Sequence, residues 1–119
     1  MNIPVFPPKL QKIEFLFSQQ GSWVAVYYTT AKGQEFFLVQ VTVVHRAEQA
    51  TVNYLQQCSV KDTLFKFPTS TDLDPSVYKM FVFNWNLEVA TTNGRIWIIE
   101  KIKNIKKNFR LYLRKQMDN

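Results

Sequence analysis

The chain has 119 residues, of which 46% are hydrophobic and 15% aromatic, and its formal net charge at pH 7 is +6. That length suits one domain spanning residues 1–119, and the apolar fraction is sufficient for a packed core. One histidine and one cysteine exclude zinc sites of the Cys₂His₂, Cys₄ and His₃ types within one chain. Three scattered glycines leave no phosphate-binding loop.

The distribution of apolar residues and the cysteine content bear on where the protein works. No stretch approaches the ~20 apolar residues that a membrane-spanning helix needs, and the first residues lack the pattern of a signal peptide. Cys58 has no partner for an internal disulfide, which favours a reducing compartment. These features predict an intracellular protein, cytoplasmic or associated with a nucleoid or nucleus, without a membrane partner.

The N-terminal part of the chain is predicted to be extended and then sheet-forming. Residues 1–8 hold three of the five prolines, which predicts an extended lead-in. Strands are expected at residues 12–17, 23–30 and 35–45, where apolar and β-branched residues alternate with polar ones. Turn sequences separate these segments, so they predict an antiparallel meander.

Residues 47–58 are expected to form a central helix. Small and apolar residues recur there every three or four positions, from Ala47 to Cys58, which is the spacing of one helix face. Thr51 and Val52 are β-branched, and they keep a strand open as the alternative.

The middle of the chain is expected to return to strands. A short strand at residues 63–67 is followed by a loop at 68–76, which is rich in Pro, Ser, Thr and Asp. Residues 77–89 predict one long strand with apolar side chains along one face. An Asn-Gly pair at residues 93–94 predicts a two-residue type I′ turn, so residues 95–100 should return as the partner strand.

Residues 101–117 change to a helical period. Apolar residues from Ile98 to Tyr112 are spaced alternately four and three apart, and cations follow the same spacing on a neighbouring face. We call these cations the cation stripe: Lys103, Lys107, Arg110 and Arg114. A helix is therefore expected to pack its apolar stripe against the sheet and to expose its cation stripe to solvent. A strand through Phe109 and Leu113 is the alternative, and it accounts for fewer residues.

Two architectures fit these elements. The first is an α+β fold: a curved antiparallel sheet of about five or six strands with one central helix and a C-terminal amphipathic basic helix. The alternative is a β-barrel of the oligonucleotide-binding type with a basic tail.

The cation stripe points to a polyanion as the partner. It spans about 16 Å along a helix, which matches about three phosphates of a stretched single strand. Lys106 adds a further charge, and aromatic rings off the predicted core face, at Tyr28, Phe36 and Tyr78, are candidates for stacking bases. We therefore expect a non-enzymatic protein that binds single-stranded DNA or RNA with little sequence specificity, without a cofactor or metal.

Other interpretations remain open from the sequence. A basic stripe can also be a solvated face, and cations near a helix C-terminus are favoured by the helix dipole. A protein-interaction module or small subunit could use residues 81–89 or an edge strand, and free edges also permit a homodimer. A metal-dependent nuclease would need converging carboxylates. The available acids, Asp72, Asp74, Glu88 and Glu100, form no such motif, so no catalytic residue is assigned.

Overall fold

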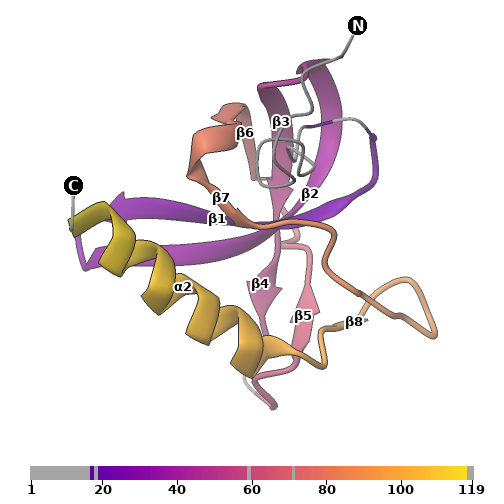
Figure 1. The fold of residues 1–119 in the computed structure, drawn as a ribbon. Coiled ribbons are helices and arrows are strands. Elements are labelled where there is room, and N and C mark those ends of the chain that lie inside the picture. The colour runs from indigo at the N-terminus through magenta and orange to yellow at the C-terminus, as the bar shows by residue number, and fades with distance from the viewer. Residues whose placement is uncertain (1–16, 18, 59, 71, 118–119) are drawn as a thin grey trace, which may run out of the picture.

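The computed structural model describes residues 17, 19–58, 60–70 and 72–117. They form two antiparallel sheets and a C-terminal helix (Figure 1), which confirms the predicted α+β class with antiparallel strands. In the part of the chain described here the larger sheet stays open, so the alternative of a closed barrel is not observed. The lead-in at residues 1–8 and most of the predicted strand at 12–17 lie outside the described residues.

The larger sheet has five strands in the order β6-β3-β2-β1-β7. These strands are β1 (Trp23–Thr30), β2 (Gly33–Arg46), β3 (Gln49–Tyr54), β6 (Leu73–Tyr78) and β7 (Val82–Asn84). The smaller sheet, in the order β4-β5-β8, consists of β4 (Gln56–Gln57), β5 (Leu64–Lys66) and β8 (Trp97–Ile98). The 3₁₀ helix η1 (Lys79–Phe81) joins β6 to β7, and α2 (Ile102–Met117) ends the described chain.

The hairpin of β1 and β2 agrees with the predicted strands at residues 23–30 and 35–45. The two strands pair continuously from Trp23↔Gln40 to Thr30↔Gly33. Gly33 closes the turn with φ 111°, a conformation that side chains with a Cβ rarely adopt. The composition of the strands and the glycine at the turn therefore specify this hairpin locally.

The helix predicted at residues 47–58 is wrong, because β3 and β4 occupy this segment. Ala50 and Val52 are fully buried and pair with β2 and β6. Thr51 Oγ1 donates to the Pro75 carbonyl at 3.0 Å. Since β2 and β6 offer backbone partners on both sides and β-branched side chains fit a pleated surface, pairing overrides the helical spacing.

The loop predicted at residues 68–76 and the long strand predicted at 77–89 are also corrected. β6 already begins at Leu73, and the extended chain is interrupted by η1 before the short β7. β6 and β7 are the two outermost strands of the sheet, so one uninterrupted strand could not pair at both edges. The three-residue η1 carries the chain from one edge to the other.

The turn predicted at residues 93–94 is a wider loop. Of the two residues, only Gly94 has a positive φ, 71°, which excludes a type I′ turn because that turn needs two such residues. Asn93 Oδ1 instead accepts backbone N–H bonds from Arg95 and Ile96 at 2.8 and 3.0 Å. The returning strand β8 then pairs mainly with β5, and only the isolated bridge Ala90↔Ile98 links it back across the loop.

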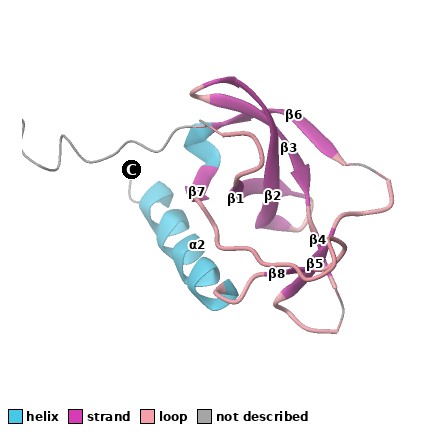
Figure 2. Ribbon diagram, turned by 90° about the vertical axis from the view of Figure 1, so that its right-hand side faces the viewer, coloured by secondary structure: helices cyan, strands magenta, loops and turns pink. Residues whose placement is uncertain are grey.

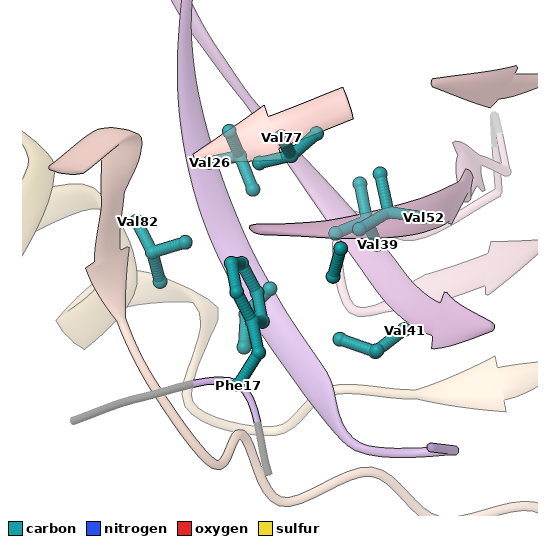
Figure 3. Packing of buried hydrophobic residues seen from close by; sticks show 9 residues of the cluster. Phe17, Val26, Val39, Val41, Val52, Val77 and Val82 are labelled. Carbon is teal, nitrogen blue, oxygen red and sulfur yellow. The ribbon is translucent and has the colours of Figure 1, made fainter. Parts of the chain in front are cut away.

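Hydrophobic clusters occupy both faces of the larger sheet. We call the first the sheet core: Phe17, Val24, Val26, Val39, Val41, Ala50, Val52, Val77 and Val82 (Figure 3). Both outermost strands contribute to it, through Val77 and Val82, so the sheet curls around this cluster. We call the second the helix core: Ala25, Leu38, Leu55, Phe65, Ile99, Ile102 and Ile105. Its residues come from α2, from strands of both sheets and from adjoining loops, and Figure 2 shows the backbone of α2 lying beside the sheets.

Candidate nucleic-acid interface

Helix α2 is held by one apolar face. Ile102 and Ile105 are each 3% exposed within the helix core. One to two turns further on, the Phe109 ring lies 5.1 Å from Phe36 and 5.2 Å from Phe83, centroid to centroid. The helix predicted at residues 101–117 is thus observed as α2, and its buried face fixes which side chains point away from the sheets.

The four residues of the cation stripe are all exposed on one flank of α2. Among the described residues, none of the four makes an ion pair or a side-chain hydrogen bond. The neighbouring Lys106 lies 4.0 Å from Asp62, and both of these side chains are about half exposed. The stripe is therefore a row of positive charges that no carboxylate compensates in the described parts of the chain.

The opposite flank of α2 is bonded to β7, to η1 and to the loop that follows β7. Asn108 Nδ2 donates to Asn84 Oδ1 at 2.6 Å, and Lys101 pairs with Glu88 at 3.1 Å. The Tyr112 hydroxyl donates to a backbone carbonyl of η1 at 2.9 Å. Since these bonds engage one flank only, the two sides of the helix differ in what they leave available to a partner.

A groove of about 990 Å³ opens beside α2. Its walls come from the helix, the β1–β2 hairpin, the end of β3 and the β4–β5 arm. Lys106 lines the groove, together with rings of Phe36, Phe65 and Phe109. The sequence did not reveal this groove, because its walls depend on how β4 and β5 stand away from the larger sheet.

Tyr28, a predicted stacking ring, is partly buried and its hydroxyl is engaged. It donates to Asp74 Oδ2 at 2.7 Å and accepts from the Tyr54 hydroxyl at 2.5 Å. Burial, with these hydrogen bonds, raises the pKa of Tyr28 far above its ordinary value. Burial also raises the pKa of Tyr54 to about 12. Tyr28 nevertheless borders the groove that Lys106 lines, so the structure brings these two predicted residues to one feature.

Tyr78 lies apart from the groove, at the end of the edge strand β6. It is 44% exposed, and two η1 residues beside it, Met80 and Phe81, are 68% and 38% exposed. The Phe81 ring stacks on Tyr27 at 6.4 Å. We call the exposed residues Tyr78, Met80 and Phe81 the η1 cluster. The sequence placed Phe81 in a core-facing strand, so the break at η1 is what exposes this cluster.

Within residues 17, 19–58, 60–70 and 72–117, no three His, Cys, Asp or Glu side chains gather as a metal site would require. None of the helices in those ranges combines the length and the hydropathy needed to cross a membrane.

No family model, curated protein or solved structure matches the chain. Function is therefore inferred from the geometry of α2 and its groove.

Proposed function

We propose that this protein is an intracellular, non-enzymatic binder of single-stranded nucleic acid, and that the cation stripe of the basic helix α2 holds the phosphates. The observation that carries the proposal is the absence of any counter-charge on Lys103, Lys107, Arg110 and Arg114 from the described residues. A row of uncompensated cations at regular spacing is what a phosphate backbone requires.

Counterion release supplies the driving force. A single strand condenses cations along its phosphates, and a protein that neutralises a phosphate releases them into solution. The three phosphates that the stripe spans predict that raising the salt from about 50 to about 200 mM weakens binding about twentyfold. Because phosphates are the same in every sequence, this mode gives little sequence preference by itself.

The test is a fluorescence anisotropy titration of a labelled single-stranded oligonucleotide at low salt. The stripe variant replaces the four cations by glutamine: Lys103→Gln, Lys107→Gln, Arg110→Gln and Arg114→Gln. The matched control removes the same number and kinds of charge from exposed positions outside α2: Lys32→Gln, Arg46→Gln, Lys61→Gln and Arg95→Gln.

We expect the stripe variant to bind at least about tenfold more weakly than the control variant. Equal losses in both variants would show that only net charge matters and would contradict a specific role for α2. No binding by the unaltered protein at low salt would remove the proposal altogether.

A protein partner is the second candidate, and the η1 cluster favours it. Tyr78, Met80 and Phe81 expose apolar surface beside the edge of β6 that no described strand pairs with, and exposed aromatic and Met side chains are enriched at interfaces. A second copy of the chain would pair there as a homodimer. Sedimentation of the unaltered protein and of the Phe81→Ser variant tests this candidate. A dimer in the unaltered protein that the variant does not form supports it, and an unaltered protein that is monomeric at all concentrations contradicts the homodimer.

A further inference from the structure

The groove beside α2 has a floor suited to flat, apolar groups. Leu38, Leu55 and Phe65 line it and are at most 7% exposed. Phe36 and Phe109 are partly buried and pack against each other at its side. Nucleic-acid bases have flat faces that stack on aromatic rings, whatever their sequence. The partly exposed rings of Phe36 and Phe109 therefore offer the surface on which bases can stack.

One rim of the groove is continuous with the cation stripe. Ile102, Lys106 and Phe109 are the α2 residues that line it. At about 100° per residue, Lys106 falls between the buried face of the helix and the stripe. A strand whose phosphates lie along the stripe therefore passes Lys106 with its bases next to the groove.

The lining outside α2 includes polar and acidic groups, which we call the second rim. Glu35 and Asp72 line the groove, with the exposed amides of Gln34, Gln56 and Gln57. The Glu35 carboxylate accepts a hydrogen bond from Thr30. The Asp72 carboxylate is exposed and bonds to no side chain or backbone N–H in the described chain. Because like charges repel, phosphates are excluded from this rim, and only base edges can face it.

We propose that the groove takes the bases of the bound single strand, with the phosphates on the α2 rim and the base edges directed at Asp72. This inference rests on the proposed function and adds to it a site for the bases and an orientation for the strand. The opposite charges of the two rims set that orientation, and the partly exposed rings of Phe36 and Phe109 supply the stacking surface.

The orientation predicts a preference among pyrimidines. Cytosine presents an N4 amine that donates hydrogen bonds, and a carboxylate is its usual acceptor, whereas thymine presents the O4 carbonyl at the same position. Asp72 therefore accepts from cytosine and repels thymine or uracil. One such bond gives oligo(dC) about a threefold to tenfold higher affinity than oligo(dT) of equal length.

The first measurement locates the strand. Methyl NMR spectra of the protein are recorded with and without oligo(dC) at neutral pH and low salt. The methyl signals of Leu38, Leu55 and Ile102 report on the groove, and those of Val41 in the sheet core serve as the reference. We expect the groove methyls to shift and the reference methyls to stay.

The second measurement tests the orientation through the ratio of the two affinities. Asp72→Asn removes the carboxylate from an exposed position, so the variant is expected to stay folded. The matched control is Glu48→Gln, which is exposed and lies outside the groove. Asp72→Asn should bring the ratio of the oligo(dC) and oligo(dT) affinities close to one, and Glu48→Gln should leave it unchanged.

The outcomes separate this inference from the function on which it rests. Salt-dependent binding without shifts of the groove methyls, or with the same ratio in Asp72→Asn, overturns the groove site and leaves the stripe standing. Groove shifts with an apolar peptide but none with oligo(dC) also overturn it, in favour of a protein partner. Absence of oligonucleotide binding at any salt concentration overturns both.

Discussion

Three polar side chains from three strands meet at the border of the groove. Tyr28 of β1 and Tyr54 of β3 share the carboxylate of Asp74 in β6, with Tyr54 at 3.2 Å and Tyr28 at 2.7 Å from the same oxygen. The backbone N–H of Ser76 donates to the other Asp74 oxygen at 3.0 Å. The carboxylate thus links the edge strand β6 to the centre of the sheet.

Removing the Tyr28 hydroxyl should therefore destabilise the protein. We expect Tyr28→Phe to lower the free energy of unfolding by about 1–2 kcal/mol, since a partly buried carboxylate loses its shortest donor. Tyr78→Phe is the control, because the Tyr78 hydroxyl is exposed and has no hydrogen bond among the described residues. Urea denaturation measures both variants, and an equal effect of the two would contradict a stabilising role for the network.

The same tyrosines predict a loss of stability at high pH. The unfolded chain releases phenolic protons at about pH 10, whereas Tyr54 in the folded protein has its pKa raised to about 12 and Tyr28 has its pKa raised further. The contribution of Tyr54 is thus complete below about pH 10 and is lost as the pH rises towards 12. The urea midpoint should fall between about pH 9 and about pH 11, and less steeply in Tyr54→Phe. Equal slopes in the two proteins would rule this out.

At the scale of elements, the sequence predicts best where local pattern and pairing agree. The hairpin of β1 and β2 was predicted because a turn with glycine joins two alternating runs, and α2 was predicted because its apolar and cationic spacings coincide. The segment 47–58 was mispredicted because β2 and β6 pair with it from both sides. Thr51 and Val52 favour a strand, but the residues of the segment do not show which strands pair with it.

The candidate site shows the same division. The cation stripe depends only on the period of one helix, so it could be predicted from residue spacing. The groove and the η1 cluster depend on contacts between distant segments, such as Lys106 with Asp62 and Phe36 with Phe109. The alternation of residues along a strand could not predict that Tyr78 is exposed whereas Tyr28 is partly buried.

The turn of the first hairpin gives a prediction for a single element. Gly33 has φ 111° with nothing within 4 Å of an added Cβ, so a side chain there would meet backbone strain and no steric clash. We expect Gly33→Ala to cost about 1–3 kcal/mol in the free energy of unfolding. Ala31→Gly in the same exposed turn should change it by less than about 1 kcal/mol. Thermal denaturation distinguishes them, and a neutral Gly33→Ala would contradict the turn geometry.

The docking of α2 gives a second prediction at this scale. Ile105 is 3% exposed in the helix core and Leu111 on the same helix is 47% exposed. We expect Ile105→Ala to lower the free energy of unfolding by about 2–4 kcal/mol, because it leaves a cavity, and Leu111→Ala to lower it by about 0.5 kcal/mol or less. Urea denaturation followed by circular dichroism measures both, and the reverse order would show that α2 packs by another face.

At the scale of the whole molecule, the charge is concentrated at one end of the chain. Residues 1–100 hold eight basic and eight acidic residues, so the net charge of +6 comes entirely from residues 101–119. α2 brings most of that charge to one flank, and its other flank is bonded to β7 and to the loop that follows β7. Among the described residues, the cations of α2 thus form a ridge beside a body whose charges nearly cancel.

The salt dependence of binding tests this account most directly. The logarithm of the association constant for a single-stranded oligonucleotide is measured against the logarithm of salt concentration, for the unaltered protein and for the stripe variant. Three phosphate contacts predict a slope of about −2 for the unaltered protein, and a slope close to zero for the stripe variant. The same steep slope in both proteins would contradict the assignment of the phosphates to α2.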